Sequence, residues 1–207
     1  MLQSLVLVIS LCIDTFVTSM AYGADKIKIP FSSGLVINAT CSFFLAISLL
    51  FGSAIKTFIP ENIAPLISFS LLLILGIYRL FESFFKNSIK KYSNIGHPLT
   101  FKLFDFKFVL EIYADEIKAD YDNSKLLSVK EAFYLAVALS LDSLTVGFGC
   151  SLGSVNLIDA VLLSFLVGAV FLILGGYVGR HFAKTLTINI SWLSGAMLIL
   201  LAFMRII

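Results

Sequence analysis

Six apolar runs constrain this chain most, because each is long enough to cross a lipid bilayer. A helix needs about 20 apolar residues to cross the hydrocarbon core. Runs of that length lie at Leu2–Tyr22, Phe31–Ala54, Ile63–Phe85, Ala132–Leu152, Leu157–Val178 and Ile188–Ile207. Only 14% of the residues are charged and 59% are hydrophobic, which is typical of an integral membrane protein. The sequence therefore predicts an all-α membrane protein with six transmembrane helices.

We expect that the first run is not cleaved as a signal peptide and that the cysteines form no disulfides. No basic residue precedes Leu2 and Asp14 interrupts the run, so we interpret it as a retained span and not a signal peptide. Cys12, Cys41 and Cys150 all fall in apolar runs, and no histidine or cysteine cluster has the spacing of a zinc site. We interpret the three cysteines as buried packing residues.

Basic residues are concentrated at or beyond the ends of the first, third and fifth runs. Thirteen of the 15 lysines and arginines lie there, and the exceptions are Lys56 and Arg205. Connections rich in lysine and arginine stay on the cytoplasmic side of a membrane. We therefore expect a multi-pass protein of a bacterial cell membrane with both termini outside. The net charge of +2 gives no indication of a nucleic-acid partner.

One motif occurs in both halves of the chain. Asp14 lies in Ser10–Ser19 (SLCIDTFVTS), and Asp142 lies in Ala138–Gly147 (ALSLDSLTVG), 128 positions later. Aligned on the aspartates, the motifs pair Leu11 with Leu139, Ile13 with Leu141 and Thr15 with Ser143. A carboxylate within a membrane span costs a few kcal/mol, so its repetition indicates a functional role.

The repeat extends to the ends of the third and sixth runs. Leu73–Phe81 matches Ile199–Ile207, and this match pairs Arg79 with Arg205. Each repeat then holds three spans, within residues 1–85 and 131–207. An odd number of spans gives the two halves opposite orientations in the membrane. Such inverted repeats bind their substrates near the midplane, between the halves.

Polar side chains accompany both aspartates. Ser10, Asp14 and Thr18 are four residues apart and share one helix face, while Asp142 has Thr145 three residues later. Carboxylate and hydroxyl oxygens suit Mg²⁺, Ca²⁺ or Mn²⁺, and two carboxylates balance a doubly charged ion. The expected ligands of a transport site are Asp14, Asp142, Thr18, Thr145 and Asn38. Two alternatives remain open, namely a purely structural pair of aspartates and an interhelical hydrogen bond from the asparagine.

Small residues four positions apart predict close helix contacts in the fifth span. Ser164 and Gly168 form one such pair, and Gly175 and Gly179 form another. Small side chains let helix backbones approach each other in lipid, so we interpret these residues as packing positions.

The segment 86–130 is too charged to be a seventh span. Lys86, Lys90 and Lys91 suit contact with anionic lipid head groups. Apolar and polar residues then alternate over 106–113 with a period of two, which predicts a short strand on the cytoplasmic side.

The end of that segment has the twelve-residue spacing of an EF-hand calcium loop. The candidate calcium ligands are Asp120, Asp122, Ser124, the Leu126 carbonyl, Ser128 and Glu131. Lys125 stands where the sharp turn normally needs glycine, and a left-handed lysine costs about 1 kcal/mol. The alternative is a capping box, in which Ser128 and Glu131 start the fourth span without a metal.

These motifs resemble a known family. Ser140–Gly149 (SLDSLTVGFG), Val155–Ile158 (VNLI) and the first aspartate motif are similar to the MntP manganese efflux pumps of the LysE-like superfamily. The loop from Ala119 to Ala132 more closely resembles the YtaF branch, which consists of sporulation-associated membrane proteins. The resemblance implies that Asp14 and Asp142 are the essential aspartates. The pumps carry an acidic residue in the second span, where this chain has Asn38–Ser42.

Two functions follow as hypotheses. The first is efflux of a divalent cation such as Mn²⁺ in exchange for protons, because buried carboxylates take up protons readily. The second is a non-transporting membrane protein of sporulation with a calcium-responsive cytoplasmic loop. No nucleophile–base pair or catalytic metal motif indicates an enzyme, and we expect no cofactor for chemistry. The expected partners are membrane lipid and the metal ion, and a homo-oligomer is left open.

Overall fold

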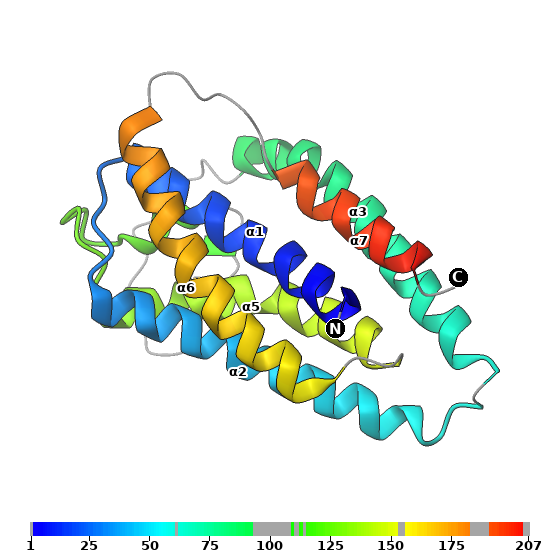
Figure 1. The fold of residues 1–207 in the computed structure, drawn as a ribbon. Coiled ribbons are helices and arrows are strands. Elements are labelled where there is room, and N and C mark those ends of the chain that lie inside the picture. The colour runs from blue at the N-terminus through cyan, green and yellow to red at the C-terminus, as the bar shows by residue number, and fades with distance from the viewer. Residues whose placement is uncertain are drawn as a thin grey trace.

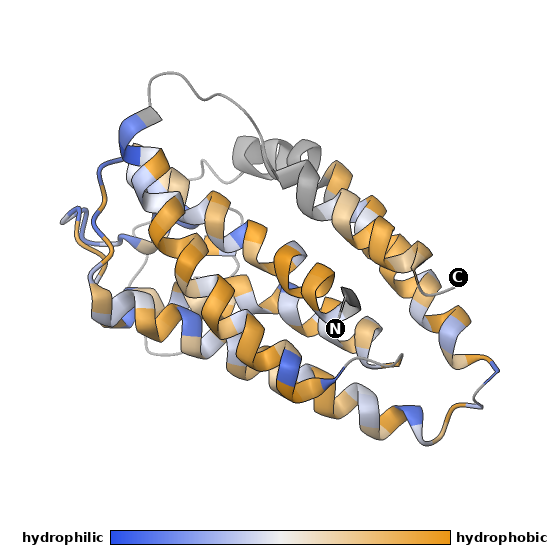
Figure 2. Cartoon of the chain, viewed as in Figure 1, coloured by the Kyte–Doolittle hydropathy of each residue, from blue (hydrophilic) through white to orange (hydrophobic). Residues whose placement is uncertain are grey.

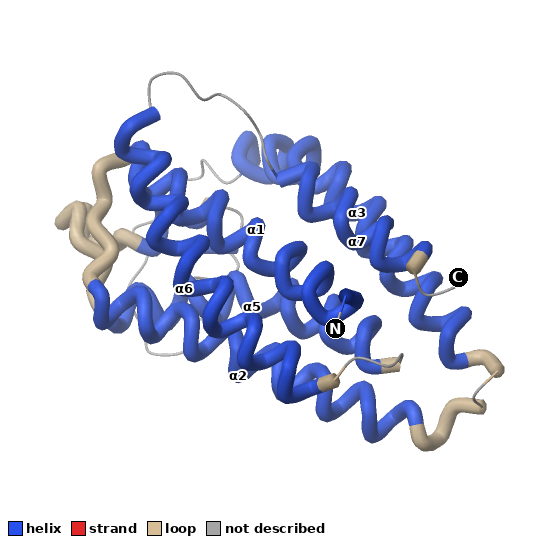
Figure 3. The backbone as a smooth tube through the Cα atoms, viewed as in Figure 1, coloured by secondary structure: helices blue, strands red, loops and turns tan. Residues whose placement is uncertain are grey.

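The described part of the chain is helical. The computed structural model describes residues 2–60, 62–92, 109, 112–113, 115–152, 156–182 and 191–204. The elements are α1 (Leu2–Ala24), α2 (Phe31–Lys56), α3 (Ala64–Tyr92), the 3₁₀ helix η1 (Glu116–Ala119), α5 (Val129–Ser151), α6 (Leu157–Phe182) and α7 (Ser191–Phe203) (Figure 1). The tube in Figure 3 places the described loops at the ends of the long helices. The all-α prediction is confirmed, and each apolar run coincides with a helix.

Four of the described helices are long and apolar enough to cross a membrane, namely α1, α2, α5 and α6. The apolar part of α3 is shorter and spans Ala64–Tyr78, and the described part of α7 has 13 residues. Figure 2 shows mainly apolar residues along α6, with hydrophilic ones near its two ends. Its exposed side chains include Leu162, Leu166 and Ile173, which a bilayer would cover. The membrane prediction is therefore supported directly by four of the six runs.

The helices pair across the two halves of the chain. The most extensive contacts join α1 to α6, α2 to α5 and α3 to α7, and smaller ones join α1 to α7 and α3 to α5. In the predicted repeat, α1 corresponds to α5, α2 to α6 and α3 to α7. If each helix in this set of contacts is replaced by its counterpart, the same pairs result. Corresponding helices run in opposite directions in Figure 1, and both termini lie toward the same end of the bundle.

Small residues make the two main pairings close, as the sequence predicted. A methyl group added at Gly175 would lie 2.5 Å from the Phe16 carbonyl oxygen of α1, and one at Gly179 would overlap the Met20 carbonyl oxygen. On the other side, a methyl group at Gly147 of α5 would lie 2.9 Å from the Ser48 hydroxyl of α2. Glycine at these positions is therefore required by the approach of the neighbouring helix.

The strand predicted over 106–113 is not found where that segment is described. Val109, Ile112 and Tyr113 have helical backbone, and the other residues of the segment lie outside the described residues. Val109 and Ile112 are buried in an apolar cluster with Tyr22, Ile27 and residues of α5. In a strand, Val109 and Ile112 would point to opposite faces, whereas a spacing of three places them on one face of a helix, and the burial of both favours the helix.

The connection before α5 is fixed to the connection between α1 and α2. Lys28 forms a parallel bridge with Leu126, and its N–H donates to the Lys125 carbonyl at 2.9 Å. The Ser33 hydroxyl donates to the Leu127 carbonyl at 2.7 Å, and the Tyr22 hydroxyl donates to the Glu116 carbonyl at 2.6 Å. These bonds hold residues 116–128 against the end of the bundle.

Some expectations fall on parts that the structure does not describe. The side chain of Arg79 and the whole of Arg205 are outside the described residues. The same is true of the side chains of Lys86, Lys90 and Lys91, which the sequence places near lipid head groups.

Candidate functional site

A small cavity lies among α1, α2, α5 and α6. Its volume of about 30 Å³ is enough for one or two water molecules or a single ion. The lining residues are Leu11, Cys12, Asp14, Thr15, Asn38, Cys41, Ser42, Leu45, Leu139, Ser143, Ser164 and Gly168. Two helices from each half of the chain therefore line the cavity. Asp14, the aspartate of the first motif, is one of the lining residues.

Asn38 is held between α2 and α6. Its amide nitrogen donates to the Phe165 carbonyl at 2.5 Å, so the alternative of an interhelical hydrogen bond is confirmed. Its amide oxygen lies against Gly168, where any side chain would overlap it. With the nitrogen used in this bond, the oxygen is the atom of Asn38 that is suited to a cation in the cavity.

The two aspartates have different surroundings. Asp14 lines the cavity and is half-buried. Asp142 is also half-buried, but it is not among the lining residues, and its carboxylate accepts a hydrogen bond of 3.3 Å from the Tyr113 hydroxyl. Thr145 is exposed and donates to the Asp142 carbonyl at 2.9 Å. Thr18 is buried, also away from the lining. Of the five ligands expected from sequence, Asp14 and Asn38 meet at the cavity.

Two hydroxyl groups at the cavity come from the repeat itself. Thr15 and Ser143, paired when the motifs are aligned on their aspartates, both line it, as do the paired Leu11 and Leu139. The sequence therefore contained the signal for these residues, namely the register of the repeat. Two further serines, Ser42 and Ser164, meet through their hydroxyls at 3.2 Å, and the sequence indicated Ser164 only as a packing residue.

Two cysteines also line the cavity, which their interpretation as packing residues did not anticipate. The Cys12 thiol donates to the Ser164 carbonyl at 3.9 Å, and the Cys41 thiol donates to the Ala136 carbonyl at 3.8 Å. Cys150 is buried in a separate apolar cluster. No disulfide joins the three residues, all of which are described. Thiols beside a carboxylate and an amide extend the range of suitable cations toward softer metals.

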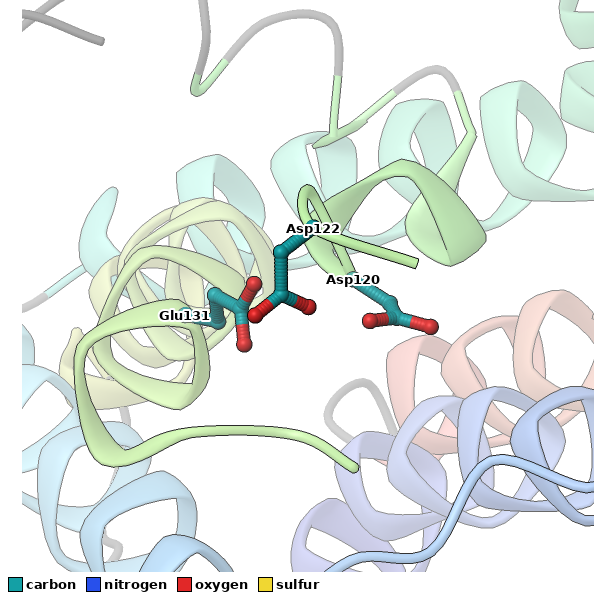
Figure 4. A group of neighbouring side chains, drawn as sticks. All are labelled: Asp120, Asp122 and Glu131. Carbon is teal, nitrogen blue, oxygen red and sulfur yellow. The ribbon is translucent and has the colours of Figure 1, made fainter. Parts of the chain in front are cut away.

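The second candidate site is a group of three carboxylates at the start of α5. Oxygens of Asp120, Asp122 and Glu131 lie within 4.8 Å of one another (Figure 4). Asp120 and Glu131 are each only 5% exposed, whereas Asp122 is exposed. Burial raises the pKa of Asp120, the Lys125 N–H lowers it, and the Glu131 and Asp122 carboxylates raise it further. Hydrogen bonds from Ser124 lower the pKa of Asp122.

Ser124, Leu126 and Ser128, the other predicted calcium ligands, form hydrogen bonds within the loop or with Glu131. The Ser124 hydroxyl donates to the Leu126 carbonyl at 3.0 Å, so these two oxygens contact each other. The Ser128 side chain accepts from the Glu131 N–H, and the Glu131 carboxylate accepts from the Ser128 N–H at 2.9 Å. The predicted capping box is therefore present, and it starts α5 at Val129.

Comparisons with known proteins identify a family and several relatives of similar length. The family described as "putative manganese efflux pump" matches residues 31–206, from the start of α2 onward. "Probable sporulation protein YtaF" of Bacillus subtilis (strain 168) is 26% identical over 210 residues, covering 100% of this chain and 99% of that protein. No solved structure matches the chain significantly.

Two further relatives carry the name of the family. "Putative manganese efflux pump MntP 2" of Clostridium botulinum (strain Hall) is 28% identical over 198 residues, covering 93% of this chain and 87% of that protein. "Putative manganese efflux pump MntP" of Methanosphaera stadtmanae is 26% identical over 207 residues, covering 98% and 97%. Because the family match extends over most of the chain, the protein belongs to the MntP family of "putative manganese efflux pumps".

Proposed function

We propose that the protein exports a divalent cation of the Mn²⁺ class across the bacterial cell membrane, with Asp14 as a ligand in transit. The observation that carries this proposal is the ion-sized cavity enclosed by four helices, in which Asp14 meets Asn38 and several hydroxyl groups. A carboxylate within apolar helices is costly unless it is paired or binds a cation. The family match and the names of the relatives support the same substrate class.

The architecture that we propose is a pair of inverted three-helix repeats, residues 1–85 and 131–207, joined by the segment 86–130. Two observations support it. The helix pairings are unchanged when the halves are exchanged, and corresponding helices run in opposite directions. Six spans and two external termini then follow from the bias of basic residues. Fusions of a cytoplasm-active reporter and of a periplasm-active reporter to the C-terminus test the orientation, and activity of only the cytoplasmic one would contradict it.

Protons are the counter-ion that we propose. Asp14 lines a cavity among apolar helices, and a carboxylate there is costly without a cation, so a proton would replace the metal when the metal leaves. Membrane lipid and the metal ion are then the immediate partners of the protein. In a homo-oligomer, the ion sites of the subunits would lie in the same membrane.

Transport in everted membrane vesicles tests the proposal. Vesicles with the wild-type protein should accumulate Mn²⁺, and Asp14→Asn should slow this at least about tenfold, equivalent to about 1.4 kcal/mol in ion binding. The matched control is Asp25→Asn, which changes an exposed acid beyond the end of α1. Equal rates for Asp14→Asn and the wild type would refute the proposal, as would wild-type rates equal to those of vesicles without the protein.

A second candidate is a membrane role in sporulation that does not require transport. It is favoured by the full-length similarity to the protein named for sporulation. In a strain that lacks the protein, Mn²⁺ sensitivity rescued by the wild type but not by Asp14→Asn supports transport. A defect in spore formation that Asp14→Asn rescues as well as the wild type supports the second candidate.

A further inference from the structure

We propose that the segment Asp120–Glu131 binds a calcium ion, and that the ion fixes the start of α5 to the connection between α1 and α2. The segment lies at the end of the bundle, and none of its residues lines the cavity that contains Asp14. The proposal therefore concerns a second cation site with its own ligands.

The buried carboxylate of Asp120 is the first observation. Its Oδ2 accepts from the Lys125 N–H at 3.3 Å, whereas its Oδ1 is buried and has no hydrogen-bond partner among the described residues. The side chain is 5% exposed. Buried polar atoms nearly always have a partner, and a carboxylate oxygen with none suits a hard cation.

The second observation is the convergence of like charges on this oxygen. Oxygens of Asp122 and Glu131 approach Asp120 within 4.8 Å, so three acidic groups from a short segment meet at one point. The Glu131 and Asp122 carboxylates both raise the pKa of Asp120, after its burial, as expected for like charges that lie close together. A divalent cation would remove this repulsion and would leave the group with one negative charge if all three carboxylates are ionised.

The backbone between these ligands has the shape that a calcium loop requires. Lys125, the sixth residue, has φ 60°, and Asn123, the fourth, has φ 52°. These left-handed residues turn the chain sharply, so the first and third side chains both accept backbone N–H bonds from within the loop. The lysine in the glycine position therefore does not prevent the turn from forming.

The Glu131 carboxylate can still bind a cation, although both of its oxygens accept hydrogen bonds. Its Oε2 accepts from both the N–H and the hydroxyl of Ser128, and its Oε1 accepts from the Tyr121 N–H at 3.0 Å. Each carboxylate oxygen can accept two bonds, so Oε1 retains one position for a cation. If the Ser128 O–H hydrogen turns away from Oε2, that oxygen also gains a position for the ion, which completes the bidentate ligand at the twelfth residue.

An all-oxygen ligand set from a single irregular loop favours Ca²⁺ over Mg²⁺, which demands near-octahedral geometry. The ion would also act on the bundle, because Leu127 of the loop is fully buried and its N–H donates to the Lys28 carbonyl at 3.0 Å. Calcium would thereby hold the ends of α1, α2 and α5 in one arrangement.

Calorimetry on the full-length protein in lipid nanodiscs tests the site, with Ca²⁺ as the titrant. The wild type should bind one Ca²⁺ with a Kd between about 10⁻⁵ and 10⁻³ M. Asp122→Asn and Glu131→Gln should each weaken binding at least about tenfold, and the glutamine keeps the capping box intact. Asp115→Asn, just before the segment, should leave binding unchanged.

Three outcomes would overturn the proposal. One is the absence of heat at millimolar Ca²⁺ for both the wild type and Lys125→Gly, in which glycine removes the left-handed lysine. Another is binding that Asp14→Asn abolishes and Glu131→Gln does not, because the ion would then occupy the membrane cavity. The third is tighter binding of Mg²⁺ or Mn²⁺ than of Ca²⁺ with the same dependence on Glu131, which would assign the site to another cation.

Discussion

The Tyr113 hydroxyl donates a hydrogen bond of 3.3 Å to the Asp142 carboxylate. Tyr113 belongs to the segment that connects the two halves, whereas Asp142 lies in the middle of α5. The connecting segment therefore reaches the second repeated aspartate and does not only link the halves.

Removing this hydroxyl should slow transport without unfolding the protein. A hydrogen bond to a charged group contributes about 1.5 kcal/mol or more, so Tyr113→Phe should lower the rate of Mn²⁺ transport about tenfold. Tyr121→Phe changes a partly exposed ring elsewhere in the loop and should transport normally. Rates of Mn²⁺ uptake by everted vesicles give the comparison. Normal transport by Tyr113→Phe would mean that the bond does not position Asp142.

Filling the cavity should abolish transport and leave the helices intact. A methyl group at Gly168 would overlap the Asn38 amide oxygen, so Gly168→Ala should reduce Mn²⁺ uptake at least about tenfold, equivalent to about 1.4 kcal/mol. Gly176→Ala is the matched control on the same helix, because a methyl group there would meet only the end of Arg180 at 3.8 Å. If both variants transported at the same rate, the cavity would not lie on the ion path.

The two thiols at the cavity should set its preference among cations. Replacing Cys12 and Cys41 with serine removes the soft ligands, so Cd²⁺ should inhibit Mn²⁺ uptake about tenfold more weakly than in the wild type. Cys150→Ser removes a buried thiol outside the cavity and should leave inhibition unchanged. Competition assays in vesicles measure the inhibition constant. If Cd²⁺ inhibited the double variant as strongly as the wild type, the two cysteines would be packing residues and not ligands.

Mutation of both repeated aspartates should show whether they share one ion. If Asp14 and Asp142 serve one site, each single change to asparagine should remove most of the transport, and the double change should cost little more. Losses that multiply would indicate two independent sites. The comparison requires all three variants at equal amounts in the membrane, which immunoblotting of the vesicles establishes.

Local patterns allowed much of the fold to be predicted. The positions of the helices follow from hydropathy, and the cap at Ser128 follows from residues three positions apart. The strand prediction relied on alternation over 106–113, but Val109 and Ile112, three residues apart, are both buried, as on one face of a helix.

The candidate site was harder to predict, because it depends on how four helices face one another. Asp14 and Asn38 were identifiable as polar residues within apolar runs. Ser164 and the two cysteines were not, because their sequence neighbourhoods resemble ordinary packing positions. The contact between Tyr113 and Asp142 depends on the path of a connecting segment, which no local pattern specifies.

The pairing of helices across the halves has a consequence for biogenesis. Among the described helices, each main partner lies in the other half, so the first three helices enter the membrane before their partners have been synthesised. They must wait there with Asp14, and with the faces that later pack against the glycines of α5 and α6, unassembled. The newly inserted first half therefore exposes these faces to lipid until α5, α6 and α7 have been synthesised.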